Sequence, residues 1–232
     1  MRLLSKCAQL RAFSAWLPPG VLRLNTTPLP NLAQICLVLF NPGDIQSIYD
    51  HCKNLKDLWI RRKPEFFTPQ VCIRKLNDLS QALAHLKSLF ISRINLHHEE
   101  FIPTLASLHD LIHLELLYAG LDDSDLHDVA HALPHLRVLG LCGNLGISTR
   151  GLAHLSKYVR GLTKLDIMAT RMDSELDTFR MLRAPDVFPE LHVLYVLEWP
   201  RTWRREFART RSGTTVVDYL QWRRRHGLDE HG

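Results

Sequence analysis

A short pattern, L-x-x-L-x-L with Ile or Val allowed at each leucine, recurs seven times between residues 32 and 196. The copies begin at Leu32, Leu55, Leu86, Leu111, Leu136, Leu162 and Leu191. The three consecutive steps from Leu86 to Leu162 are almost equal in length, which is hard to obtain by chance. Self-similarity with a period in this range indicates a solenoid built from stacked repeats.

The spacing inside each copy defines a short strand with one apolar face. The last two apolar residues stand two positions apart, so both point to the same side of the strand. One such strand cannot bury this face alone, whereas stacked copies form a parallel sheet with a continuous apolar core. The segment 146–155 follows one copy and shows a helix start, with Ser148 or Thr149 as N-cap and Leu152 and Leu155 at helical spacing. We therefore predict an α/β solenoid with a curved parallel sheet on its concave side and helices on its convex side.

These residues resemble a leucine-rich-repeat protein, in particular the ribonuclease-inhibitor-like and the F-box-associated cysteine-containing groups. Asn144 matches the asparagine of L-x-x-L-x-L-x-x-N, and 146–155 resembles the start of the helix in F-box-type repeats. In neighbouring copies the asparagine position is occupied by Ala119, Ile94 and Thr170. The resemblance implies the fold over roughly residues 30–200. As one possible role, it implies substrate recognition in an F-box-type ubiquitin ligase, with the F-box missing from this chain.

Three segments are expected: a degenerate repeat or cap at 1–29, about seven repeats at 30–198, and an Arg/Trp-rich cap or tail at 199–232. The degenerate copy is expected at Leu10, Phe13 and Ala15. The first residues read like the end of a repeat helix, which favours a truncated form of a longer protein. The net charge of +5 comes from the two ends, because 1–43 and 199–232 each carry +4 and the residues between them carry −3.

Residues between and just after the ladder leucines line the predicted concave face. Large apolar side chains form a stripe there, and charged residues edge it. An exposed apolar stripe with a polar rim is typical of protein-binding surfaces, and aromatic residues are enriched at hot spots. We predict non-enzymatic binding of another protein by Trp59, Arg61, Phe90, Glu115, Leu117, Lys164, Asp166, Met168 and Tyr195. The alternative is that the strand register is shifted in some repeats, or that a terminal segment covers this face.

The carboxy-terminal segment combines arginine with tryptophan at 199–205 and 222–225. Such a mixture can bind phosphates and stack on bases, so nucleic-acid or acidic-surface binding is an alternative function. We favour an end cap, in which tryptophan and Phe207 seal the last repeat, arginine faces water, and Val216 and Val217 supply a final strand.

Histidines at positions 127, 131 and 135 are evenly spaced by four, a spacing at which two histidines of a helix can share a metal ion. Pro134 ends the helix before His135, and no H-E-x-x-H motif occurs, so we interpret them as solvated helix surface and predict no metal site. Signatures of nucleophilic catalysis, phosphate-binding loops and dinucleotide-binding loops are also missing from the sequence. We therefore predict no catalytic residues and no cofactor.

The five cysteines are scattered and form no C-x-x-C pair, which favours buried free thiols in a reducing compartment. No apolar run approaches the length of a membrane span. We expect a cytoplasmic or nuclear protein. Residues 1–24 are basic and free of acidic residues, so a mitochondrial-targeted assembly factor residing in the matrix is the alternative.

Overall fold

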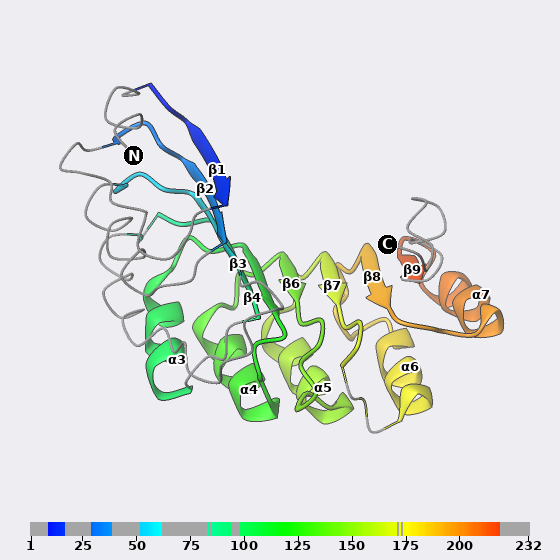
Figure 1. Ribbon diagram of the computed structural model, residues 1–232. Helices are drawn as coiled ribbons and strands as arrows, with labels where there is room; N and C mark the ends of the chain where they lie inside the picture. Colours follow the sequence, from blue (N-terminus) through cyan, green and yellow to red (C-terminus); the bar gives the residue numbers. More distant parts are fainter. Residues whose placement is uncertain are drawn as a thin grey trace. The chain divides into compact units, whose positions relative to one another are not determined.

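Each copy of the apolar pattern forms a short strand in the computed structural model, which describes residues 9–16, 29–38, 52–61, 83, 85–93, 98–170, 172 and 174–218 (Figure 1). The chain divides into two compact units, Met1–Ala119 and Gly120–Gly232. We call them unit 1 and unit 2 and describe each by itself.

The described part of unit 1 contains five parallel strands in sequence order and one helix. These elements are β1 (Ala12–Trp16), β2 (Gln34–Val38), β3 (Asp57–Arg61), β4 (Ser88–Ser92), α3 (His98–Ser107) and β5 (His113–Leu117). Equivalent positions of successive repeats pair directly. For example, Leu58 of β3 lies beside Leu89 of β4, which lies beside Leu114 of β5. The register therefore advances by one whole repeat from strand to strand, although the repeats differ in length.

The described part of unit 2 alternates helices and strands. These elements are α4 (Asp123–Ala132), β6 (Val138–Gly140), α5 (Thr149–Tyr158), β7 (Lys164–Asp166), α6 (Glu175–Arg183), β8 (Val193–Val196), α7 (Arg201–Thr210) and β9 (Thr215–Asp218). The four strands pair in parallel and in sequence order. The helices α4, α5 and α6 lie on one side of β6, β7 and β8 (Figure 1). Parallel strands covered by helices on one side form the predicted α/β leucine-rich-repeat architecture.

The apolar ladder forms the core of both units. Every ladder residue of the seven copies, from Leu32 to Val196, is buried. In the degenerate copy, Phe13 is only half-buried and pairs with Ile35 of the next strand. The final strand expected around Val216 and Val217 is present as β9.

Side-chain caps fix the starts of α4 and α5. Asp122 caps α4 by accepting from the backbone N–H groups of Ser124 and Asp125, and the Asp125 side chain accepts in return from the backbone N–H of Asp122. Ser148, one of the two predicted N-caps, caps α5 through the N–H of Arg150. Each cap satisfies backbone donors that have no partner within the helix.

Cys36, Cys52 and Cys142 form no disulfide bond, as expected. Of these three, only Cys52 is buried, so the expectation of burial is wrong for Cys36 and Cys142. These two side chains are half-buried because they lie on the open side of the sheet, opposite the buried ladder residues. Among the described residues, no helix combines the length and the apolar character that a bilayer crossing requires. Two predictions lie outside the described residues: the end of a repeat helix in the first residues of the chain and the arginine–tryptophan run at 222–225.

Candidate functional site

The open side of the unit 1 strands carries a row of side chains that alternate with the buried ladder. We call this surface the strand face. Its central row joins equivalent positions of five neighbouring strands: Ser14, Cys36, Trp59, Phe90 and Glu115. Neighbouring strands lie about 4.8 Å apart, so side chains in one row touch.

Trp59 and Phe90 form the aromatic centre of the strand face. Their rings stack with centroids 4.9 Å apart and planes 13° from parallel. Trp59 nevertheless exposes 42% of its surface, while Phe90 is half-buried. Phe90 thus holds the indole in place, and one side of the indole remains available to a partner.

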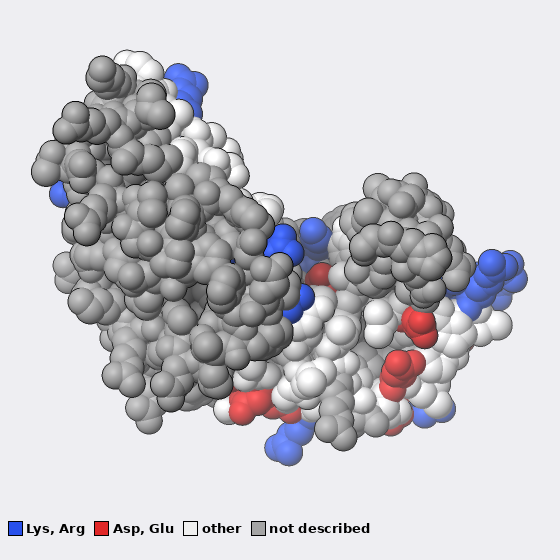
Figure 2. Space-filling view, in the orientation of Figure 1, with Lys and Arg blue, Asp and Glu red and all other residues white. Residues whose placement is uncertain are grey.

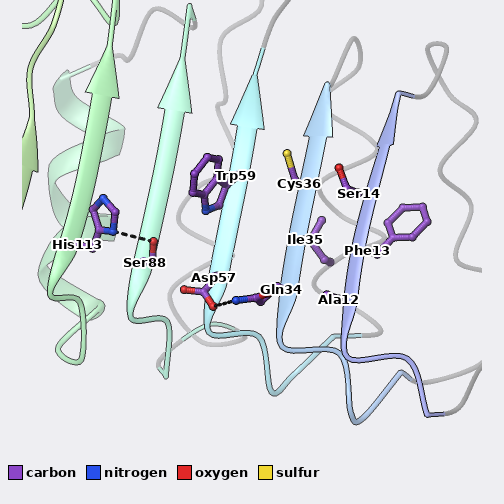
Figure 3. Close-up of a pocket in the computed structure, with 10 residues that line it drawn as sticks. All are labelled: Ala12, Phe13, Ser14, Gln34, Ile35, Cys36, Asp57, Trp59, Ser88 and His113. Atoms are coloured by element: carbon purple, nitrogen blue, oxygen red, sulfur yellow. Dashed lines mark hydrogen bonds between the residues drawn. The ribbon is translucent and has the colours of Figure 1, made fainter. Parts of the chain in front are cut away.

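A groove of about 590 Å³ runs beside this pair across β1 to β5 (Figure 3). Its lining residues are Ala12, Phe13, Ser14, Gln34, Ile35, Cys36, Asp57, Trp59, Ser88 and His113. Near the amino-terminal ends of the strands, Gln34 donates a hydrogen bond to the Asp57 carboxylate at 2.9 Å. The groove therefore combines an aromatic wall with fixed polar groups, as small ligand-binding and peptide-binding sites do.

A second set of polar side-chain contacts joins Ser88, His113 and Glu115. The Nδ1 atom of His113 lies 3.4 Å from Ser88 Oγ, and its Nε2 atom lies 2.6 Å from Glu115 Oε1. These residue types also occur in acyl-transfer triads, but the serine contact is at the long limit of a hydrogen bond and Ser88 is buried. The short His113–Glu115 contact instead orients both side chains on the strand face.

Arg61 and Leu117 occupy the next row of the same face, with Ser92 between them. Arg61 is exposed and Leu117 is half-buried. The five predicted residues of unit 1 therefore lie on one face, in two adjacent rows.

The four predicted residues of unit 2 form a separate group. Lys164 places its Nζ atom 5.0 Å from the centroid of the Tyr195 ring, a cation–π contact. Asp166 Oδ1 accepts a hydrogen bond from the backbone N–H of Met168 at 2.9 Å, so this carboxylate shapes the turn after β7. All four side chains are half-buried.

The carboxy-terminal aromatic residues pack on one another and on α6. Trp203 stacks on Phe179 with centroids 5.0 Å apart, and Trp199 meets the same ring edge-on at 5.3 Å. Phe207 is completely buried. Figure 2 shows Lys and Arg side chains as well as Asp and Glu side chains on the described part of unit 2. The end cap expected at 199–232 stays a prediction.

The expectation that arginine faces water is wrong for Arg211. This side chain exposes only 7% of its surface and donates hydrogen bonds to the carbonyl oxygens of Leu182, Ala184, Val187 and Phe188. The carbonyls at the end of α6 have no partners within the helix, and a planar guanidinium can serve several of them at once.

The predicted binding residues did not include Ser14, Gln34 and Cys36, which the first two strands contribute to the groove. The repeat pattern contains the signal that could have found them. These residues occupy in the first two copies the positions that Asp57 and Trp59 occupy in the third.

No protein-family model matches this sequence, and no curated protein is significantly similar to it. Among solved structures, the tropomodulin C-terminal domain of Caenorhabditis elegans is similar at 18% identity and a TM-score of 0.44, over 66% of this chain and 96% of that one. An internalin from Listeria monocytogenes is similar at 15% identity and a TM-score of 0.46, over 81% of this chain and 61% of that one. At these scores neither likeness carries an argument about function.

Proposed function

We propose that this protein is a non-enzymatic interaction module that binds another protein through its strand face, with the Trp59–Phe90 pair as the anchor. The observation that carries this proposal is an exposed indole held in one orientation beside a groove with polar walls. A large aromatic side chain fixed before binding loses little conformational entropy when a partner covers it. Such residues are enriched among those that contribute most to binding.

The chemistry of the groove indicates what the partner presents. Trp59 offers a flat apolar surface. Asp57 precedes it by two residues on β3, and Glu115 lies beside Phe90 on β5, so two carboxylates lie near the aromatic pair. The matching segment therefore carries a large apolar side chain next to a basic one. Such a segment gains apolar burial on the indole and charge-assisted hydrogen bonds at its edges.

The test measures partner capture by variants of the full chain. Affinity purification from native cells, followed by identification of the bound protein, provides a partner whose affinity can be measured directly. Trp59→Ala is expected to weaken that affinity by about 30-fold, the effect of a hot spot contributing about 2 kcal/mol. Leu145→Ala is the matched control, because Leu145 is an exposed apolar residue of unit 2 outside the strand face.

The series continues with Phe90→Ala, Glu115→Lys and Tyr195→Ala. Each variant is first checked by thermal unfolding, so that lost capture is separated from lost folding. Capture that survives all four substitutions with unchanged affinity contradicts the proposal.

A finer role, substrate recognition in an F-box-type ubiquitin ligase, is supported by the resemblance of 146–155 and by no contact described above. Its test is whether the captured partner is ubiquitinated at a lower rate when this chain is removed from cells.

The alternative of nucleic-acid or acidic-surface binding is supported by the arginines of 199–232. It requires retention on RNA, DNA or anionic vesicles that falls steeply with salt and is lost when these residues are deleted.

We place the interaction in the cytoplasm or nucleus, on the basis of the scattered cysteines. Determining the mature amino terminus in cells distinguishes this location from the mitochondrial matrix, because import removes a targeting segment.

A further inference from the structure

Three histidines of unit 2 converge on the outer side of two neighbouring helices, away from the strands. His127 and His131 stand one turn apart on α4, and His154 lies on α5, which packs against α4. One potential ligand nitrogen of each histidine lies within 4.8 Å of the other two. Ring centroids are 4.5 Å apart for His127 and His131 and 4.4 Å apart for His127 and His154.

A carboxylate contact fixes the ring of one histidine of the cluster. His127 uses Nδ1 to contact Asp128 Oδ1 at 3.1 Å, so its Nε2 atom carries the lone pair. Metal-binding histidines commonly use the second ring nitrogen in this way, since a carboxylate fixes the tautomer and the ring orientation. Asp128 therefore fits the role of an outer-shell partner.

His154 supplies an independent observation. Its Nε2 atom is buried and has no hydrogen-bond partner among the described residues. Buried polar atoms in folded proteins nearly always have a partner, and an exception needs a physical explanation. Burial, followed by His127, Lys157 and His131, lowers the pKa of His154. A metal ion bound between the three histidines would give this buried nitrogen the partner that it lacks among the described residues.

The cluster is accessible from solution. His127 and His154 line a pocket of about 410 Å³ together with Asp123, Ser124, Asp128, Arg150 and Gly151. The two carboxylates offset the positive charges of Arg150 and Lys157 around the cluster. An ion can enter through the pocket, and a water molecule can occupy a further coordination position there.

We propose that His127, His131 and His154 bind a divalent transition-metal ion of the Zn²⁺ type through three imidazole nitrogens. Imidazole is a preferred ligand of such ions. Tetrahedral coordination at about 2.05 Å places the nitrogens about 3.4 Å apart. The nitrogens must therefore approach one another by about 1.4 Å at most, and His127 and His131 are exposed enough to rotate inward. The fourth position faces the pocket, and the bound ion connects α4 with α5.

The experiment titrates metal-free full-length protein with ZnCl₂ by calorimetry, after chelation and with a reductant present. Wild type is expected to bind Zn²⁺ at this site, and His127→Ala, His131→Ala and His154→Gln are each expected to weaken binding at least tenfold. His135→Ala is the matched control, because His135 continues the spacing of His127 and His131 but lies outside the cluster. It should leave the affinity unchanged.

Two further measurements keep the test independent of folding and of the cysteines. Co²⁺ should give the visible absorption of tetrahedral nitrogen coordination in wild type and in His135→Ala, and lose it in His131→Ala. Asp128→Asn should weaken Zn²⁺ binding less than removal of a ligand does. The proposal is overturned if wild type does not bind Zn²⁺, if His154→Gln binds as wild type does, or if His135→Ala weakens binding as much as the three ligand variants do.

Discussion

Asn144 and Leu121 belong to successive repeats, yet the side-chain oxygen of Asn144 accepts a hydrogen bond from the backbone N–H of Leu121 at 3.2 Å. The amide nitrogen of the same side chain donates to the carbonyl of Leu141 at 2.8 Å. Asn144 is completely buried. One side chain therefore satisfies backbone groups of two successive repeats in a place that water does not reach.

Replacing Asn144 by alanine is expected to destabilise the protein by about 2–4 kcal/mol. The backbone N–H of Leu121 loses its side-chain acceptor, and the Leu141 carbonyl keeps only the backbone N–H of residue 144 as donor. The midpoint of urea unfolding measures the effect. Asn54→Ala is the matched control, since Asn54 also donates to a backbone carbonyl, of Pro30, but at an exposed position. A loss at Asn144 no larger than that at Asn54 contradicts this account of the repeat contact.

Arg211→Met is expected to cost about 3 kcal/mol, since the carbonyl oxygens of Leu182 and Val187 lose the guanidinium donor. The carbonyl oxygens of Ala184 and Phe188 also lose it but keep a backbone N–H donor. Arg211→Lys should recover only part of this loss, because an ammonium lacks the planar fork that reaches several carbonyls. Arg209→Ala, at an exposed position in the last turn of α7, should stay within about 0.5 kcal/mol of wild type. If the Met and Lys variants are both as stable as wild type, the guanidinium contributes nothing to the free energy of unfolding.

Gly151 leaves room for the contact between Asp123 and Ser148. The Asp123 carboxylate accepts hydrogen bonds from the backbone N–H and the hydroxyl of Ser148 at 2.8 and 2.5 Å, and a Cβ atom on residue 151 would lie 2.1 Å from Asp123 Oδ1. Gly151→Ala is therefore expected to destabilise the wild-type protein by about 1–2 kcal/mol. In an Asp123→Ala background the same change should stabilise by about 0.5–1 kcal/mol, because alanine is the better helix former. A double-mutant cycle by urea unfolding measures how Gly151→Ala changes the free energy of unfolding in each background. If Gly151→Ala destabilises both backgrounds equally, the steric explanation is wrong.

The thiol of Cys52 is expected to react far more slowly than those of Cys36 and Cys142. Burial raises the pKa of Cys52 to about 12, so its reactive thiolate form is scarce even at pH 9, whereas the other two side chains are half-buried. Alkylation with iodoacetamide, followed by peptide mass analysis, should show Cys52 labelled at least about 100-fold more slowly in the native protein. In urea the three rates should become similar. Equal rates without urea would contradict burial of this thiol.

The ladder and its register could be read from the sequence because a strand alternates with a period of two and each repeat adds one strand. Trp59 and Phe90 are separated by the longest step between copies, but each occupies the position between two ladder residues, so the register alone brings their rings together. The register does not depend on the residues that separate the copies. Asn144 was singled out by its match to L-x-x-L-x-L-x-x-N, and the structure shows that its side chain is buried.

The convergence of the three histidines depended on the packing of two helices. The sequence shows His127 and His131 one turn apart, but His154 belongs to the following repeat and looks like an ordinary surface residue. The N-cap of α5 is Ser148 and that of α4 is Asp122, so His154 and Asp128 occupy equivalent positions of the two helices. His154 therefore lies beside the part of α4 that carries His127 and His131. Helix length and N-cap position are needed for that alignment, and the apolar pattern does not determine either.

The burial of Arg211 is a second feature that the sequence does not reveal. Its charge predicts exposure, and its burial is favourable because its guanidinium donates to four carbonyl oxygens in the last turn of α6 and the turn that follows. The sequence by itself determined which residues form the parallel strands and which of their faces is buried, because apolar spacing acts within each short segment. The tertiary structure alone decided which polar side chains of different repeats meet, because those contacts depend on how neighbouring helices and turns align in space.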